Sequence, residues 1–246
     1  MDIILYNIVI ALISVLLGYF FGAIPFGIIL GKVFFHRDPR NEGSGNSGGT
    51  NVGRVFGKKF GVICIALDAI KCVVPLIIVW AVLKFSGVKE LFLNKLGQPM
   101  FDDGILYIYL SAVGAMLGHC YPIYVGFKGG KAVSSYAGFG LGTGWGVTLV
   151  GVAAFFITLK KTKYVSLSSM MLATFSTIFS WILFGLNSII PVEYRNIVMW
   201  GNGNYMIFGW EFASAVTIGA ILLILRHIPN IKRLIAGTES KIKWMK

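Results

Sequence analysis

The sequence predicts an all-α, polytopic integral membrane protein, and three observations support this fold class. Hydrophobic residues occupy 56% of the 246 positions, and the mean hydropathy is +0.77. Charged residues occupy only 13%, roughly half of the share of about 25% that soluble globular domains carry. Several apolar runs also exceed the roughly 20 residues that a helix needs to cross a bilayer. We expect residues 1–246 to form a single transmembrane domain.

The apolar runs predict helices near residues 4–30, 60–83, 105–126, 133–159, 164–189 and 205–226. The fourth run contains five glycines between Gly138 and Gly146, and a regular helix would lose roughly 1 kcal/mol at each of them relative to alanine. Lysines flank this run at both ends. We therefore expect two short helices that form a hairpin with both ends on the cytoplasmic side, which makes seven helical segments in total.

The first two runs contain residues with expected packing roles. Gly18 and Gly22 allow a neighbouring helix backbone to approach closely, and Pro25 is expected to kink the first helix. Asp68 and Lys71 lie on one face of the second helix, where they can pair. Charges inside a membrane span are costly and usually face the protein interior. A structural ion pair is preferred here over a role in substrate binding.

Other features of the runs and loops carry less information. The first run lacks a basic leader, so we expect a full span and not a cleavable signal peptide. Ser166 is expected to cap the helix at 164–189, which is preferred over contact with a substrate. The loops at 85–103 and 190–204 are expected to lie outside the cell. The cysteines are isolated in apolar segments and are expected to be buried thiols; they are Cys64, Cys72 and Cys120.

The formal net charge of +12 is explained by membrane topology and not by nucleic-acid binding. Most basic residues lie between positions 32 and 59, between 128 and 163, or after 225, and few lie in the loops between these regions. By the positive-inside rule the richer side is cytoplasmic, so the N-terminus lies outside and the C-terminus inside. Anionic headgroups and an anionic substrate are both compatible with this excess.

The segment 43–54 reads Gly-Ser-Gly-Asn-Ser-Gly-Gly-Thr-Asn-Val-Gly-Arg and has the composition of a phosphate-binding loop. Glycines let backbone N–H groups converge on an anion, and the polar side chains add donors. A P-loop is excluded because the required lysine and the preceding strand are absent, and a flexible linker rarely carries so many donors. The candidate ligands are Gly43, Ser44, Gly45, Asn46, Gly48, Thr50, Asn51 and Arg54.

A second cluster lies between the third and fourth runs. Lys128 and Lys131 flank Gly129 and Gly130 just before an apolar helix, and His119 is nearby. This spacing brings backbone N–H groups, a helix N-terminus and two ammonium groups to one place, which suits an anion. The ordinary alternative is that the lysines only anchor the ends of the spans.

A third cluster follows the last run and contains His227, Asn230 and Glu239 among basic residues. A basic tail bound to lipid headgroups would explain Lys232 and Arg233, but it would not explain His227 or Asn230. We expect all three clusters to meet at the cytoplasmic face, where a phosphorylated substrate with an acyl chain can enter from the lipid.

The acidic residues restrict the chemistry. The cytoplasmic segments contain three acids, Asp38, Glu42 and Glu239, without the clustered carboxylates that usually hold Mg²⁺. No nucleophilic cysteine or Ser-His-Asp order is apparent. We therefore expect catalysis by positioning and charge neutralisation, with no metal and no cofactor.

These three motifs, in this order, resemble those of the PlsY family of bacterial acyl-phosphate:glycerol-3-phosphate acyltransferases. The resemblance runs from about Gly18 to Lys241 and includes Asp68, Lys71 and the Tyr-Val-Ser at 164–166. It implies transfer of a fatty acyl group from acyl phosphate to the 1-hydroxyl of sn-glycerol 3-phosphate, which yields lysophosphatidate and phosphate and begins phospholipid synthesis. Neither acyl-CoA nor acyl carrier protein would be used.

The resemblance also implies a location and partners. The enzyme would have seven helices in the bacterial inner membrane and an active site on the cytoplasmic side. Its partners would be acyl phosphate, glycerol 3-phosphate, membrane lipids and the upstream enzyme that forms acyl phosphate, with no nucleic acid.

Roles for individual residues follow from the resemblance. Ser44 and Arg54 would be essential, His227 and Asn230 would serve catalysis and binding, and Glu239 would support structure. The family is thought to use the substrate's own phosphate as the base, whereas the residues alone favour His227. The sequence leaves open which lysine contacts which substrate. Glycerol 3-phosphate would be bound by Lys128, Gly129, Gly130 and Lys131.

Two residues depart from the family pattern. Gly49 stands where the family usually has alanine, and we expect it to add flexibility only. Ala132 stands where the family usually has glycine. If that position requires a positive φ, alanine strains the turn, although activity is expected to survive.

Two other functions fit parts of the sequence. A transporter or flippase for an anionic phosphorylated lipid metabolite would also have glycine-broken helices and basic helix ends. The absence of an obvious internal repeat, and motifs confined to one face, count against it. A membrane scaffold with basic loops would retain its function after Ser44→Ala or Arg54→Ala.

Overall fold

The computed structural model describes residues 3–86, 104–186, 189–191, 194, 197–200 and 208–242. Every regular element in these segments is helical, which confirms the predicted fold class. The loop expected at 85–103 lies almost entirely outside the described residues, and so does much of the loop at 190–204. The chain forms two compact units, Met1–Phe139 and Gly140–Lys246.

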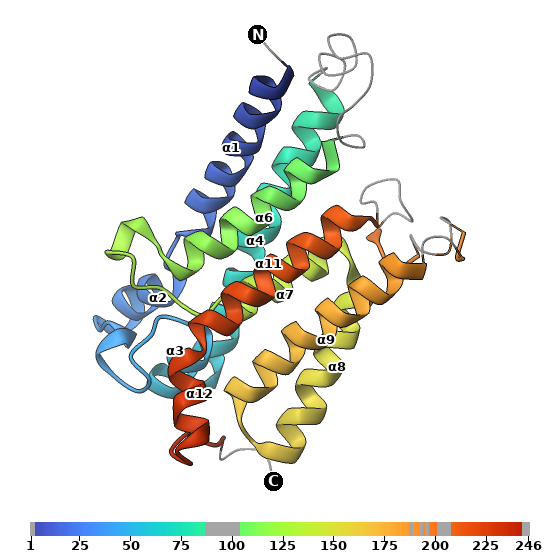
Figure 1. Ribbon diagram of the computed structural model, residues 1–246. Coiled ribbons are helices and arrows are strands. Elements are labelled where there is room, and N and C mark those ends of the chain that lie inside the picture. Colours follow the sequence, from blue (N-terminus) through green and yellow to red (C-terminus); the bar gives the residue numbers. More distant parts are fainter. Residues whose placement is uncertain are drawn as a thin grey trace. The chain divides into compact units, whose positions relative to one another are not determined.

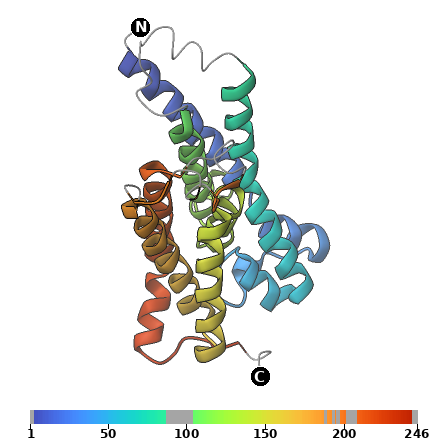
Figure 2. The same ribbon diagram turned by 90° about the vertical axis from the view of Figure 1, so that its right-hand side faces the viewer.

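In the first unit, α1 and α6 run side by side (Figures 1 and 2). A Cβ atom on Gly18 would lie 1.8 Å from the Ser111 carbonyl oxygen, and one on Gly22 would lie 2.0 Å from the Ala115 carbonyl oxygen. The close backbone approach expected at these glycines is therefore confirmed. The helices of this unit are α1 (Ile3–Gly22), α2 (Phe26–Phe35), α3 (Gly49–Phe56), α4 (Lys58–Phe85), α6 (Ile105–Cys120) and the start of α7 (Val133–Thr143), with 3-10 turns η1 (Pro39–Asn41) and η3 (Ile123–Val125).

The first apolar run is broken at Pro25. Helix α1 ends at Gly22 and α2 begins at Phe26, so the expected kink is a complete break. Proline cannot donate a helical hydrogen bond and crowds the preceding turn. The carbonyl oxygen of Ile24, at the break, accepts a hydrogen bond from Lys71 Nζ at 2.8 Å. A buried residue of α4 therefore stabilises the interruption.

The second unit contains the rest of α7, α8 (Trp145–Thr162), α9 (Val165–Gly185), α11 (Trp210–Arg226) and α12 (Ile228–Ile235). Helix α9 packs against both α8 and α11 (Figure 1). A Cβ atom on Gly140 would lie 2.0 Å from Thr148 Oγ1, although these residues would be roughly 12 Å apart along one straight helix. The chain therefore turns back at Gly144, as the glycines predicted. Helix α8 has 18 residues and is longer than the short arm expected.

Five described helical segments are long and apolar enough to cross a membrane, and a sixth is added if α11 and α12, which are bent by 55°, form one span. The chain is therefore a multi-pass membrane protein. All three cysteines are buried thiols, as expected.

The expected cap at Ser166 is wrong. Helix α9 begins at Val165, and Tyr164 occupies the N-cap position without a side-chain hydrogen bond. Ser166 is the second residue of the helix, and its side chain is buried. A capping side chain has to come from the residue that precedes the helix, and Ser166 lies two positions after that residue.

Candidate active site

The glycine-rich loop is organised around Asn51 on α3, whose side chain is fully buried. Its Nδ2 donates to the carbonyl oxygens of Pro39 at 2.7 Å and Asn46 at 2.8 Å. Its Oδ1 accepts a hydrogen bond from the Ser44 backbone N–H at 2.7 Å. Both ends of the amide are thus occupied inside the loop, and Asn51 shapes the site. The sequence predicted Asn51 as a ligand but not this organising role.

Two glycines of the loop require a left-handed backbone. Gly43 has φ +63° and Gly45 has φ +70°, a region that glycine enters without steric cost. A Cβ atom on Gly43 would also lie 2.3 Å from Asn51 Oδ1. These turns present Ser44 at the surface, where its Oγ donates to Asn51 Oδ1 at 3.1 Å and accepts from Asn46 Nδ2 at 2.9 Å.

The loop leads directly into the N-terminus of α3. Gly48 is the N-cap residue and provides no side-chain cap, so the first N–H groups of the helix lack helical partners. Such a helix end favours an anion. Thr50 and Arg54 lie four residues apart on the same face of α3, and both are exposed. Within the described residues, Arg54 has no hydrogen bond or ion pair.

Gly49 is a packing residue, so the expectation that it only adds flexibility is wrong. A Cβ atom there would lie 2.4 Å from Ile65 Cγ1 and 2.9 Å from the Gly61 carbonyl oxygen. Its lack of a side chain allows α3 to lie closely against α4, which holds the glycine-rich loop on a long helix.

In the second cluster, Gly129 and Gly130 lie directly against His119 at the end of α6. The backbone N–H of Gly130 donates to the His119 carbonyl oxygen at 3.1 Å. A Cβ atom on Gly129 would lie 2.1 Å from that oxygen, and one on Gly130 would lie 2.1 Å from His119 Nε2. The two lysines flank this turn, with Lys128 exposed and Lys131 partly buried.

The Gly-Gly turn is supported by a buried charged group. Lys71 Nζ lies 2.8 Å from Asp68 Oδ1, as the sequence predicted, and His119 Nδ1 lies 3.5 Å from the same oxygen. Asp68 Oδ2 also accepts from Cys64 Sγ at 3.6 Å, and that sulfur lies 3.9 Å from the carbonyl oxygen of Ser47. A continuous series of contacts along α4 thus joins the glycine-rich loop to the second cluster.

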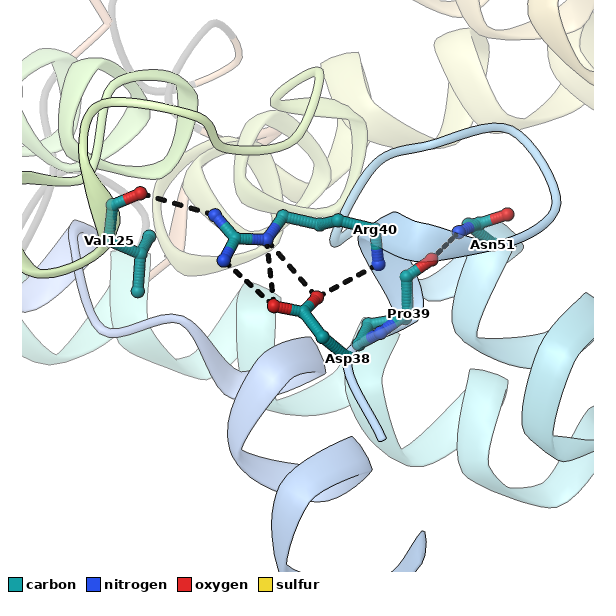
Figure 3. Close-up of polar contacts among 5 residues, drawn as sticks. All are labelled: Asp38, Pro39, Arg40, Asn51 and Val125. Atoms are coloured by element: carbon teal, nitrogen blue, oxygen red, sulfur yellow. Dashed lines mark hydrogen bonds and ion pairs between the residues drawn. The ribbon is translucent and has the colours of Figure 1, made fainter. Parts of the chain in front are cut away.

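A second connection joins the same two clusters through Arg40, which the sequence analysis did not single out. Arg40 Nη1 donates to the Val125 carbonyl oxygen at 3.2 Å, while its Nε and Nη2 donate to the Asp38 carboxylate (Figure 3). Hydrogen bonds from the Arg40 side chain hold the pKa of Asp38 below its usual value, against the opposing effect of partial burial. An Asp-x-Arg sequence directly before a glycine-rich loop was the available signal.

The third cluster lies in the second unit, where α11 meets α12. His227 is buried, and its Nδ1 lies 2.8 Å from the Leu223 carbonyl oxygen. A carbonyl can only accept, so Nδ1 carries a proton and donates to it. Glu239 accepts from Asn230 Nδ2 at 2.7 Å and from Arg233 Nε at 2.6 Å.

The carboxylate of Glu239 has a lowered pKa. Burial by itself would raise this pKa, but the hydrogen bonds from Asn230 and Arg233 outweigh the burial. Glu239 is therefore a charged acceptor that orients Asn230 and Arg233. The structure thus unites the residues of the first two clusters in one unit and groups His227, Asn230 and Glu239 in the other.

Ala132 does occupy a left-handed backbone position, with φ +61°, and its side chain is fully buried. An L-residue in this region is strained by roughly 1–2 kcal/mol. We expect Ala132→Gly to stabilise the protein by less than about 1 kcal/mol, because the relief of strain is partly offset by the greater entropy of glycine in the unfolded chain. Thermal unfolding in detergent measures this change.

The matched control is Ala137→Gly in the interior of α7, where glycine should destabilise by about 0.8–1 kcal/mol. If both substitutions lower the melting temperature equally, the strain at Ala132 is refuted.

The model of the family described as glycerol-3-phosphate acyltransferase matches residues 12–237. A glycerol-3-phosphate acyltransferase from Staphylococcus carnosus (strain TM300) is 37% identical over 235 residues, which cover 95% of this chain and 98% of that relative.

The solved structures of PlsY (YgiH), an integral membrane glycerol 3-phosphate acyltransferase, are also similar. Its glycerol 3-phosphate form has a TM-score of 0.70 and 27% identity, covering 95% of this chain and 96% of that chain. Its lysophosphatidic acid form has a TM-score of 0.68 and 26% identity, covering 95% of each chain.

Proposed function

This chain belongs to the glycerol-3-phosphate acyltransferase family, and we propose that it transfers a fatty acyl group from acyl phosphate to the 1-hydroxyl of sn-glycerol 3-phosphate. The products are lysophosphatidate and inorganic phosphate, and the reaction begins phospholipid synthesis. Family membership identifies an acyltransferase of the membrane, which favours this activity over the transporter and the scaffold considered from the sequence.

The observation that supports an acyl-phosphate donor is the pairing of two anion-binding features within one unit. The glycine-rich loop combines the N-terminus of α3 with Ser44 and Arg54, and the second feature combines two lysines with a Gly-Gly turn. Both rest on α4, through Gly49 and through Asp68. Two such features suit a reaction in which each of the two reactants carries a phosphate group.

We assign the donor's phosphate to the glycine-rich loop and glycerol 3-phosphate to the second cluster. Arg54 and the amides of α3 would stabilise the negative charge that grows on the phosphate as it leaves. Gly129, Gly130, Lys128 and Lys131 would hold the acceptor. Of the predicted ligands, Gly43, Gly45 and Asn51 act by shaping the loop, and His119 acts by supporting the Gly-Gly turn.

In the proposed step, the 1-hydroxyl oxygen attacks the carbonyl carbon of acyl phosphate. A carbon–oxygen bond forms with the acceptor, and the bond from the same carbon to the phosphate oxygen breaks. The hydroxyl proton leaves with the phosphate or passes to His227, the base that the residues alone favour. Asn230, oriented by Glu239, would bind substrate in the same reaction.

We further propose that residues 1–246 act as one catalytic domain in the bacterial plasma membrane, with the motifs on the cytoplasmic side and the N-terminus outside. The basic residues between 32 and 59 support this orientation through the positive-inside rule. An active site at the inner leaflet would receive acyl phosphate from the membrane and from the enzyme that forms it.

Purified protein in detergent tests this function. Phosphate should be released from acyl phosphate only when glycerol 3-phosphate is present, together with an equal amount of lysophosphatidate, and acyl-CoA should not replace the donor. Arg54→Ala should lower the rate about 10- to 100-fold, because a charge-assisted hydrogen bond contributes about 1.5–3 kcal/mol.

Lys59→Ala is the matched control, since Lys59 is an exposed base five residues away, and its rate should stay within about 2-fold of wild type. Acyl transfer from acyl-CoA would refute the proposed donor. Phosphate release without an acceptor would refute the proposed reaction.

A further inference from the structure

We propose that Arg40, oriented by Asp38, is a positioning residue that fixes the glycine-rich loop relative to the Lys128–Lys131 turn and thereby sets the rate of acyl transfer. The proposal rests on the proposed function, because it assigns one phosphorylated reactant to each of these two segments. It adds a residue pair that lies outside the three motifs.

The Asp38 carboxylate holds the Arg40 side chain in one orientation. Nε lies 3.1 Å from both carboxylate oxygens, and Nη2 lies 2.8 Å from Oδ2. The backbone N–H of Arg40 also donates to Oδ1 at 2.9 Å, since Asp38 is the N-cap residue of η1. The two side chains are only 25% and 17% exposed. A planar guanidinium that donates hydrogen bonds to a carboxylate from two of its nitrogens has little freedom to rotate.

The remaining nitrogen of Arg40 reaches the second cluster. Figure 3 shows Nη1 directed at the carbonyl oxygen of Val125, which it approaches to 3.2 Å. Val125 ends η3 and stands three residues before Lys128. The intervening residues Gly126 and Phe127 have φ +69° and +60°. The hydrogen bond therefore anchors a tightly turned segment at the point where it begins.

The same short segment is attached to the glycine-rich loop. Asn51 Nδ2 donates to the carbonyl oxygen of Pro39, the residue before Arg40 (Figure 3). Pro39 thus contacts the organising residue of the first motif, and the adjacent Arg40 contacts the segment that leads into the second. All three guanidinium nitrogens are engaged with protein groups, so Arg40 acts through the loops and not on the reactants.

This arrangement predicts a specific kinetic effect. Each loop would keep its own ligands if Arg40 were lost, so each substrate would still bind. The relative placement of the reactants would change, and a shift of about 1 Å can reduce a rate by about 100-fold. The rate constant kcat should therefore fall while KM for both substrates changes little.

The test is Arg40→Lys, compared with wild type for kcat, KM and melting temperature. A lysine can pair with Asp38, but its single ammonium cannot reproduce the planar fork that also reaches Val125. We expect kcat to fall about 10-fold, KM for acyl phosphate and glycerol 3-phosphate to stay within about 3-fold, and the melting temperature to stay within a few degrees.

Asp38→Asn is the second variant and keeps the size of the side chain. We expect it to lower kcat less than Arg40→Lys does. The double variant should be no slower than Arg40→Lys alone, because two residues that act through one contact are not additive. Arg37→Lys is the matched control, since Arg37 is an exposed base of the same segment that pairs with Glu42.

A distance measurement separates this proposal from the proposed function. Spin labels at Thr50→Cys and Tyr124→Cys, both exposed positions, should give a narrow distance distribution that broadens in Arg40→Lys. An inactive wild type would refute the function, while this broadening would still support the linkage. Unchanged kcat with an unchanged distribution, a raised KM with normal kcat, or multiplicative effects in the double variant would each overturn the proposal.

Discussion

Gly129→Ala is expected to lower the rate of acyl transfer by more than about 100-fold. The added Cβ would lie 2.1 Å from the His119 carbonyl oxygen and 2.5 Å from Pro122 Cδ. The carbonyl belongs to the last turn of α6, and a Cβ on the adjacent Gly118 would lie 2.1 Å from the Tyr19 carbonyl oxygen on α1. Because α6 has no room to retreat, the 128–131 segment has to move and carry both lysines with it.

The measurement is the steady-state rate with saturating glycerol 3-phosphate, normalised to the folded protein recovered by size exclusion. Gly185→Ala is the control, since a Cβ there would have no heavy atom within 4 Å, and its rate should equal that of wild type. Gly130→Ala should be less severe, because its Cβ would meet the side chain of His119, which is able to adjust. A Gly129→Ala enzyme with a rate within about 3-fold of wild type would contradict the assignment of this turn to the acceptor.

Lys71→Met is expected to destabilise the protein by about 3–5 kcal/mol, the usual effect of removing one partner from a buried ion pair. Lys71 Nζ contacts Asp68 at 2.8 Å and caps the Ile24 carbonyl oxygen at 2.8 Å. Its loss would leave Asp68 charged and buried beside His119, and would leave the break at Pro25 without its donor. The melting temperature in detergent, followed by tryptophan fluorescence, measures the effect.

The double variant Asp68→Asn/Lys71→Met is the decisive comparison. It removes the uncompensated charge, so it should recover part of the lost stability even though it has one more substitution. Lys59→Met, at an exposed position of the same helix, should change stability by less than about 0.5 kcal/mol. Equal melting temperatures for the single and the double variant would show that the ion pair is not the source of the effect.

Much of the architecture follows from local sequence patterns. Apolar runs of membrane length predicted the helices, and the glycines between 138 and 146 predicted the turn at Gly144. The i, i+3 spacing predicted the Asp68–Lys71 pair, which the structure confirms at 2.8 Å. Motif order identified the family, which the comparisons confirm.

The expectations that were wrong depended on neighbours or on a boundary. Gly49 was interpreted as a source of flexibility because the surrounding sequence does not reveal which residue packs against it. A Cβ atom on Gly49 would lie 2.4 Å from Ile65 Cγ1. Ser166 was interpreted as a cap, but it is the second residue of α9 and lies two positions after the N-cap residue Tyr164. Arg40 was counted only as a basic residue of the cytoplasmic side.

The amino-acid sequence by itself determined that this chain spans a membrane, where its long apolar segments lie and which family it belongs to, because hydrophobic length and motif order are properties of contiguous residues. Only the tertiary structure decided which motif residues shape or support the loops through contacts inside the protein. Asn51 organises the glycine-rich loop through hydrogen bonds, and His119 supports Gly129 and Gly130. Arg40 links its segment to Val125. Each of these roles depends on a contact between residues far apart in the chain, and close approach in space is set by packing that no local pattern records.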